Sequence, residues 1–437
     1  MKGQEQILNH FSEVFRALET TQRGHSGQEW NTFRKAAFQA LLKTDFPDRK
    51  HEDWKYTPVA KLTSPPYLLA KPGNVPGVAP ISDFAPYVLR IINGWLDTTQ
   101  LDPSLAEKNI RVIPIQEAMS LPEFRSSFEA LLTTQSSNGN KAFDYLNFAF
   151  HVHAFYIDIP PKLVLDKPIE IDFIHQDASV SFSHPLYFIR FGAESQVTVF
   201  ERFEGTLADS DLPAEGLINS IGYFHLEKGA RIQHIKWQNL PSPHHLVYKR
   251  MIAQKRDSNF QTLAFDYGGQ IVRNTVEVEL EESNTYTSLQ AGFIARGKQS
   301  MDHQTRINHL VPHGESHELY KGIIDDQANG AFNGKVYVHP DAQKTNAFQQ
   351  NDTLVLSSNA VMNSKPQLEI FADDVKCSHG ATIGQLDQRA LFYLQSRGLD
   401  QLSATYMLKS AFLAVVLDQV SVDPIRDYIA SQMGMKP

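Results

Sequence analysis

Alternating apolar and polar residues dominate the middle of this chain. From Phe148 onward, short alternating runs follow one another and are separated by turn clusters rather than by helical patterns. The runs read HVHAFYIDI, LYFIRF, QVTVFERF, ARIQHIKW, NTVEVEL and KVYVHP. A period of two is typical of a strand with one buried face. The pattern therefore predicts a mainly β core over residues 148–396.

Turn motifs of one kind recur between these runs. They are GAES at Gly192, KGAR at Lys228, HGES at His313 and PDAQ at Pro340, at uneven spacing. Repeated strand and turn units of this size are typical of a solenoid. A parallel β-helix fits better than a sandwich because Asn-Gly and Asp-Gly hairpin signals are few. Periodicity alone leaves the choice between these two folds open.

Helical spacing appears on both sides of the predicted core. Before it, apolar residues recur at helical intervals at Trp30, Phe33, Ala37 and Leu41, and mixed strand and helix signals follow. Residues 1–147 are therefore predicted to form a helical and α/β region. After Gly398 the period returns to 3.6, and one predicted apolar face holds Met407, Ala411, Phe412, Val415 and Val416. Residues 397–437 are predicted to form a helical segment.

Composition narrows the functional classes. The net charge of -8 over 437 residues argues against nucleic acid or an anionic membrane surface as the main partner. The first residues lack the basic and apolar regions of a secretory signal, and no apolar run is long enough to span a membrane. The single cysteine excludes an intrachain disulfide. We expect a cytoplasmic protein.

That cysteine lies in the stretch PQLEIFADDVKCSHGATIGQLDQRALFYLQSRGL, from Pro366 to Leu399. Cys377 and His379 are two residues apart, so in a strand their side chains leave on one face with roughly 6.6 Å between them. A thiolate and an imidazole at this separation can reach one metal ion. A closed tetrahedral site needs four ligands, so this pair needs others. The alternative is a buried cysteine beside a structural histidine.

The same stretch resembles the C-terminal core motif of the SufB/SufD family of iron-sulfur cluster assembly proteins. The CSHGAT form, with Gly380 where SufB members tend to carry an acidic residue, is similar to the SufD branch. Upstream, PDRKHEDWKYT from Pro47 to Thr57 resembles the N-terminal signature of that branch. Further similar segments are LNFAF at Leu146, KPIEI at Lys167 and GGQIVRN at Gly268. The resemblance covers most of the chain.

This resemblance implies a right-handed parallel β-helix and a non-catalytic scaffold subunit. SufB would pair with the β-helix, and the SufC ATPase would dock on the C-terminal helices, about Asp400 to Met433. A nascent iron-sulfur cluster, shared transiently with SufB, would lie at the SufB interface near His379 and Cys377. No catalytic residue and no bound nucleotide are expected in this chain, and a homodimer is possible in isolation.

Two other functions stay open from the residues alone. A cysteine-dependent hydrolase on a β-helix is one, since Lys376 beside Cys377 would favour a thiolate. A homodimeric metal-binding scaffold is the other. The segment from Gly292 to Gln299 is close to a nucleotide-binding P-loop, but Gln299 stands where the motif needs Ser or Thr, and we expect a turn there.

Overall fold

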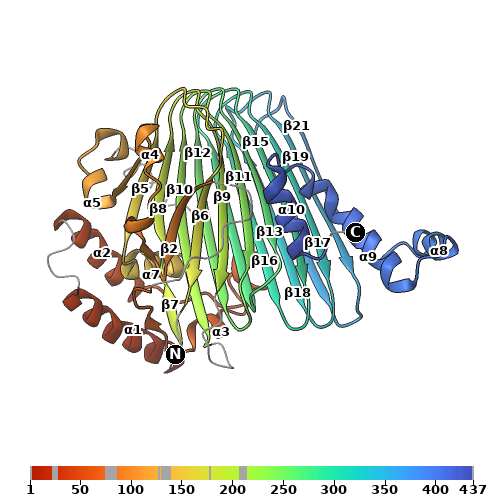
Figure 1. The fold of residues 1–437 in the computed structure, drawn as a ribbon, viewed down its shortest axis with the longest axis horizontal. Helices are drawn as coiled ribbons and strands as arrows, with labels where there is room; N and C mark the ends of the chain where they lie inside the picture. Colours follow the sequence, from red (N-terminus) through yellow and green to blue (C-terminus); the bar gives the residue numbers. More distant parts are fainter. Residues whose placement is uncertain are drawn as a thin grey trace.

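Two long sheets, of 11 and 10 strands, form a β-solenoid in this computed structural model (Figure 1). The structure describes residues 2–21, 28–73, 86–125, 128, 139–176, 179–205 and 214–435. Through the core the chain passes alternately from one sheet to the other, so each strand pairs in parallel with the strand two positions along the sequence. The predicted parallel β-helix, flanked by N-terminal and C-terminal helices, is confirmed.

The first sheet holds the even-numbered strands of the core together with four N-terminal strands. In chain order its strands are β1 (Leu68–Leu69), β4 (Arg111–Pro114), β5 (Ala154–Ile159), β7 (Ser181–Ser183), β8 (Leu186–Phe191), β10 (Gly216–Leu226), β12 (His245–Gln254), β14 (Ile271–Leu280), β16 (Ser300–His309), β18 (Asn329–Val338) and β20 (Val361–Ile370).

The second sheet holds the odd-numbered strands of the core and three strands that precede them. In chain order these are β2 (Tyr87–Ile92), β3 (Trp95–Leu96), β6 (Ile169–His175), β9 (Gln196–Gly205), β11 (Arg231–Asn239), β13 (Asn259–Asp266), β15 (Tyr286–Ala295), β17 (Glu315–Ile324), β19 (Asn346–Val355) and β21 (Lys376–Gly384).

Helices lie mainly before and after the solenoid strands. The N-terminal ones are α1 (Lys2–Thr21), α2 (Gln28–Leu41), η1 (Glu52–Trp54), α3 (Val59–Thr63), η2 (Thr98–Gln100), α4 (Ser104–Glu107), α5 (Ile115–Ala118) and α7 (Ala142–Phe150). The C-terminal ones are α8 (Gln388–Ser396), α9 (Gln401–Leu417) and α10 (Asp423–Gln432).

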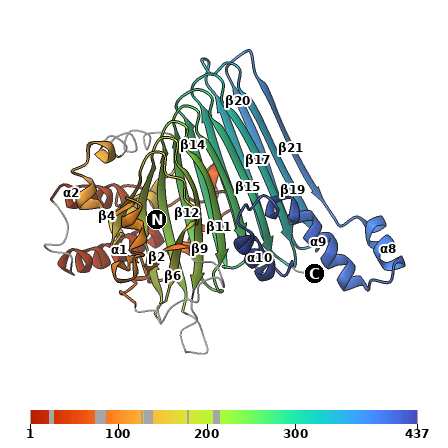
Figure 2. The ribbon, with the colours of Figure 1, turned by 45° about the horizontal axis from the view of Figure 1, so that its top comes forward.

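Side chains of successive strands stack in rows because the pairing register is continuous. One such row runs through Ile232, Phe260, Thr287, Ser316 and Ala347, and its residues are all buried inside the solenoid. Alternate residues face outward, and helices cover part of each outer face. Helices α1, α2, α5 and α7 pack on the first sheet, whereas α9 and α10 pack on the second. Figure 2 shows α1 and α2 at one end of the stack and β20 and β21 at the other.

Two predictions from the hydrophobic pattern are wrong in detail. The expected apolar face of α9 is buried only in part: Val416 is buried, but Met407 and Val415 are about half exposed, at 48% and 50%. The buried face is completed by Leu413 and Leu417, which pack against the second sheet. The run that begins HVH is not a strand from its start. His151 follows the C-terminus of α7, is buried, and accepts a hydrogen bond from the Trp30 indole at 2.8 Å.

The EDWKYT segment (residues 52–57) ties the N-terminal region to the middle of the solenoid. The Trp54 ring stacks on Phe143 at 5.0 Å, and the Arg273 guanidinium lies 4.3 Å from the Trp54 ring centroid. Arg273 also donates to the backbone oxygen of Asp53 at 2.7 Å and to Asp302 at 2.6 Å, and Thr57 donates to the same Asp302 oxygen. Trp54 is therefore a buried aromatic anchor with a charged partner.

Charged side chains also lie deep inside the solenoid. Arg250 donates to Glu201 at 2.9 Å, and the Tyr248 hydroxyl donates to the same carboxylate at 3.1 Å. Burial acts to raise the pKa of Glu201, but Arg250 and His234 outweigh it and hold that pKa well below its ordinary value. The interior is thus a mixture of apolar rows and charged side chains, and the buried Glu201 carboxylate is paired with a buried guanidinium.

Glu318 on β17 is a buried carboxylate without a cationic partner among the described residues. Its hydrogen-bond donor is the neutral amide of Gln349, its register neighbour on β19. Burial raises the pKa of Glu318 to about 7, although hydrogen bonds from Thr305 and Gln349 act in the opposite direction. The protonated form is therefore favoured in the folded chain below about pH 7.

Replacing Trp54 tests the anchor. Trp54→Ala should lower the free energy of unfolding by about 3–5 kcal/mol, the usual range for deleting a buried large aromatic side chain. Trp54→Phe keeps a ring for Phe143 and Arg273 and should lose clearly less. Urea unfolding followed by circular dichroism measures both values, and equal losses in the two variants would contradict the role of the stacked ring.

Glu318→Gln should stabilise the protein more at pH 8 than at pH 5. The folded pKa of Glu318 is about 7, against 4.5 for an ordinary glutamate, so the wild type loses stability as the pH rises between these values. The variant lacks this loss, and its advantage should grow by about 3 kcal/mol across the interval. Urea unfolding at both pH values measures it. Glu13→Gln, at an exposed glutamate on α1, is the control and should show no such growth.

Candidate functional site at the open end of the solenoid

The solenoid ends at strands β20 and β21. Each is the last strand of its sheet, and no described segment pairs with its outer edge. Large apolar side chains are exposed here, including Phe371 at 55% and Ile383 at 53%. An edge strand presents unpaired backbone N–H and C=O groups, so this end is a template for pairing with another chain.

Cys377 points into the solenoid from β21. Its register row continues through Ala347, Ser316 and Thr287, which are all buried. Cys377 is only half-buried because the row ends with it, and it packs beside Ala372 and Ala347 in a small apolar cluster. Burial raises the pKa of the Cys377 thiol, although the Ala347 backbone acts in the opposite direction. The thiolate form, which the cysteine-hydrolase alternative requires, is therefore disfavoured.

His379 occupies the next inward position of the same strand. Its row runs back through Gln349, Glu318 and Leu289, all of them buried, whereas His379 itself is exposed at the end of the stack. Two residues apart in one strand, Cys377 and His379 lie on the same inward side of β21. A buried polar pair, Gln349 and Glu318, therefore lies directly behind the histidine.

This arrangement offers a metal ion two donors from one side. Among the described residues, no group of three or more His, Cys, Asp and Glu side chains is placed to hold a metal. A tetrahedral site that used Cys377 and His379 would need two further ligands from outside the described residues. A bound metal would also have to displace the thiol proton, because the thiolate is the ligand form.

Gly380 lies beside this pair, on the outward side of β21. A Cβ atom placed there would meet the Gln350 side-chain oxygen at 2.5 Å, so any larger residue displaces that amide. On the same outer face, the His317 ring stacks on Phe348 at 5.2 Å, in a shallow hollow that Ser378 and Gly380 also line. The small residue keeps the strand edge flat at this point.

Sequence reasoning missed Glu318 and Gln349. Both stand at inward positions of their strands, and this parity was the available signal. Their alignment with His379 depends on the register between coils that are widely separated in sequence, and the turns between those coils differ in length.

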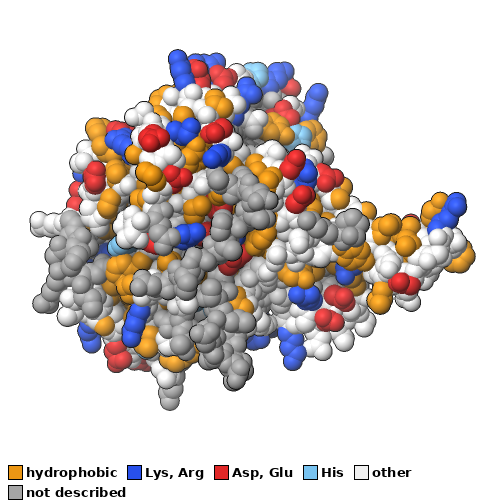
Figure 3. All heavy atoms as spheres, viewed as in Figure 1, with side chains coloured by type: hydrophobic (Ala, Val, Ile, Leu, Met, Phe, Trp, Pro, Cys, Tyr) orange, Lys and Arg blue, Asp and Glu red, His pale blue; other side chains and the backbone are white. Residues whose placement is uncertain are grey.

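The C-terminal helices form a second feature of this end. Asp387 caps α8 by accepting from the backbone N–H of Arg389 at 2.8 Å, and α8 projects from the body of the molecule (Figure 1). Together, α8 and the first half of α9 make a projecting arm (residues 388–407). Apolar side chains are exposed along it, among them Phe392 at 72% and Leu402 at 84%, and Figure 3 shows such side chains gathered on the projecting part.

The segment that is close to a nucleotide-binding P-loop forms a turn between two strands. Residues 292–299 leave β15, turn, and enter β16, so no helix follows the glycines as a P-loop requires. The described helices are all too short or too polar to cross a membrane.

Comparison with known proteins gives the family. Residues 173–412 match the model of the SufBD core domain of the SUF system for FeS cluster assembly, and residues 4–171 match that of the SufBD N-terminal region. An iron-sulfur cluster assembly SufBD family protein of Synechocystis is 31% identical over 89% of this chain and 86% of its own. Iron-sulfur cluster assembly protein SufD of Escherichia coli is 27% identical over 91% of each chain, and that of Bacillus subtilis is 27% identical over 64% of this chain and 63% of its own. The chain belongs to the SufBD family of iron-sulfur cluster assembly proteins.

Proposed function

We propose that this chain is a SufD-type scaffold subunit of a SufB–SufC–SufD complex that builds iron-sulfur clusters. The observation that carries this proposal is the open solenoid end, where an unpaired strand edge holds a two-donor half-site. The chain binds SufB through this end and the SufC ATPase through the C-terminal helices. It has no catalytic residue of its own.

The shape of the open end supports a partner with a similar fold. The outer edges of β20 and β21 need hydrogen-bond partners, and a second solenoid presents strands of the same spacing. The exposed apolar residues Val361, Ile370 and Ile383 lie on these two strands and would be covered by the same contact. SufB, the paired member of the family, fits this requirement.

Iron and sulfide are the cargo of such a complex. His379 and Cys377 supply two donors at the interface, and the partner supplies the others. The raised pKa of the Cys377 thiol favours release of its proton only when a metal replaces it. His379 is exposed and is therefore the more accessible ligand.

A homodimeric scaffold is the second candidate, because a second copy of this chain presents the same edge. A two-fold pairing through β20 and β21 would bring two half-sites together. The two functions differ in one outcome: a stable homodimer that does not exchange with SufB would favour the second.

His379→Ala should reduce the iron bound to the complex. Anaerobic co-expression with SufB and SufC, followed by purification, gives the bound iron and sulfide for the wild type and the variant. Loss of one donor should weaken iron binding roughly tenfold or more, since even changes around metal ligands cost this much. Complex formation should stay unchanged because His379 is exposed at the end of its row, so its truncation leaves the buried rows of the solenoid intact.

Two variants separate the roles within this experiment. His51→Ala, at an exposed histidine on the N-terminal region, is the matched control and should leave iron unchanged. Cys377→Ser shows whether the thiol contributes. Unchanged iron in His379→Ala would remove the site assignment, and the absence of any complex with the wild type would refute the proposed function.

The projecting arm should be required for SufC but not for SufB. Phe392→Asp with Leu402→Asp places two charges on the apolar surface of α8 and α9, and two lost anchors should weaken SufC binding at least about 30-fold. Affinity capture of SufC and of SufB measures both contacts. Val164→Asp, at an exposed apolar residue far from the arm, is the control. Retained SufC binding in the arm variant would contradict this docking surface.

A further inference from the structure

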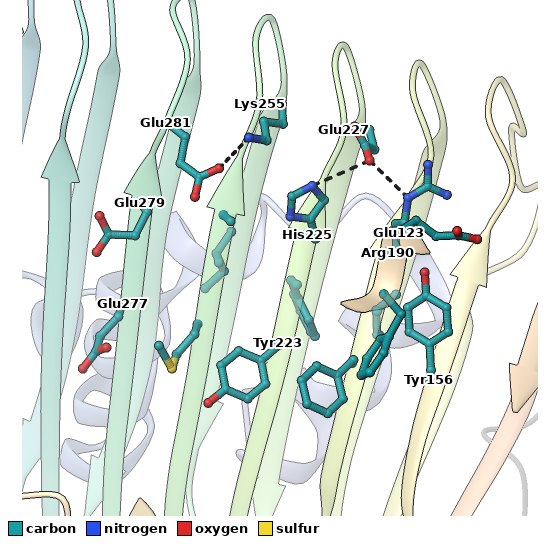
Figure 4. Close-up of a pocket in the computed structure, with 17 residues that line it drawn as sticks. Glu123, Tyr156, Arg190, Tyr223, His225, Glu227, Lys255, Glu277, Glu279 and Glu281 are labelled. Atoms are coloured by element: carbon teal, nitrogen blue, oxygen red, sulfur yellow. Dashed lines mark hydrogen bonds and ion pairs between the residues drawn. The ribbon is translucent and has the colours of Figure 1, made fainter. Parts of the chain in front are cut away.

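A pocket of about 350 Å³ lies on the outer face of the first sheet, near its N-terminal end and away from β21. Strands β5, β8, β10, β12 and β14 form its base, and Phe124 and Glu123 close one side. Figure 4 shows the outward side chains of these strands converging on the space. The volume is in the range of small-molecule sites in proteins.

One row of the pocket is aromatic and apolar. The register places Tyr156, Phe188, Tyr223 and Met251 side by side across four strands. Phe188 and Tyr223 are stacked at 4.9 Å with an angle of 14° between the ring planes. The Phe124 ring contacts the Phe188 ring edge-on, with 5.1 Å between the ring centroids. These rings form a rigid wall against which a flat group can lie.

The next row of outward side chains contains the gap that forms the pocket. It runs through Arg190, His225, Ala253 and Glu279 on adjacent strands. Ala253 carries only a methyl group, so the side chains of His225 and Glu279 face each other across roughly 9.5 Å of sheet, the width of two strand spacings. A planar group of one ring fits between them.

The pocket is strongly acidic. Its carboxylates outnumber its cationic groups five to two, and they are Glu123, Glu227, Glu277, Glu279 and Glu281. Four of these carboxylates have a cationic partner: Glu123 pairs with Arg111, Glu227 with Arg190, Glu277 with Lys249 and Glu281 with Lys255. Among the described residues, Glu279 is the lining carboxylate without an ion pair. Burial lowers the pKa of His225, so this ring is neutral near pH 7.

Glu279 is the carboxylate at the centre of the gap. Its hydrogen bond comes from the neutral amide of Asn308 at 2.5 Å. Burial raises the pKa of Glu279 to about 7, and the nearby charges of Glu277 and Glu281 add to this, whereas Asn308 and Arg306 oppose it. A positive charge placed in the gap would relieve this repulsion.

We propose that this pocket binds a small organic cation with a flat apolar body, of the aryl amidine, aryl guanidine or arylalkylamine class. The charged group donates to Glu279, and the body lies against Tyr223 and Met251. An aromatic wall beside carboxylates attracts a cation through both the ring faces and the charges. Anions are disfavoured by the acidic lining, and no set of three metal-ligating side chains exists among the described residues.

Benzamidine is the probe that tests this proposal, with benzamide as its neutral isostere. Both are titrated into the full-length wild-type chain and followed by ligand-observed NMR and calorimetry. Benzamidine should bind saturably at one site, with a dissociation constant in the millimolar range or tighter, and benzamide at least about tenfold more weakly. Equal binding of the two, or no saturable binding of benzamidine, would overturn the proposal without any variant.

Three variants locate the site. Glu279→Gln keeps the shape and should weaken benzamidine at least tenfold, and Ala253→Leu fills the gap and should abolish binding. Glu315→Gln makes the same charge change on the second sheet and should leave binding unchanged. Circular dichroism confirms the fold of each variant. Unaltered binding in Glu279→Gln would place the ligand elsewhere and refute the assignment.

Proton release gives an independent readout. A bound cation favours the ionised form of Glu279, so binding should tighten from pH 6 to pH 8 and release protons, as calorimetry in buffers of different ionisation enthalpy measures. The other charged groups that face the gap are Glu277, Glu281, His225, Lys255 and Arg306. Glu279→Gln should lose this proton release, whereas a release that persists in the variant would exclude Glu279 as the binding carboxylate.

Discussion

Every strand in a parallel solenoid depends on the next coil for its backbone hydrogen bonds. Within the stack this requirement is met on both sides, and the continuous register buries the inward rows as a consequence. The requirement fails only at the two ends. At the first end, β3 pairs antiparallel with β2, β4 pairs antiparallel with β5, and helices cover the outer face of the first sheet. At the other end β20 and β21 stay open in the described chain, and Cys377 and His379 lie there on the last strand.

The same stacking explains how much the sequence could predict. Alternation reveals strands locally, so the β core and the shared face of Cys377 and His379 follow from spacing. The rows themselves need the register between coils, and a turn that differs by one residue would move every later side chain to the other face. The sequence alone therefore could not predict that Glu318 and Gln349 lie behind His379, or that Ala253 leaves a gap on the outer face. The buried face of α9 was missed for another reason: the helix is apolar on nearly every side, and only the contact with β15 and β17 selects Leu413 and Leu417.

The two outer faces of the solenoid serve different purposes. The second sheet is covered by α9 and α10, which place the projecting arm beside the open end. The first sheet is covered only toward its N-terminal part, and the acidic pocket lies where that cover stops. Open end, arm and pocket are thus separate surfaces of one rigid scaffold, and each can be changed without altering the others.

The contacts of the EDWKYT segment affect how the chain folds during its synthesis. Thr57 bonds Asp302, which lies 245 residues later, and Glu52 pairs with Lys365, which lies 313 residues later. At ribosomal rates of about 5–20 residues per second, the first of these partners emerges roughly 12–50 s after the segment itself. During this interval Trp54 lacks its Arg273 cover, and the N-terminal helices have only part of the sheet on which they pack. A new chain therefore exposes an aromatic, apolar surface for seconds, until the middle coils are made.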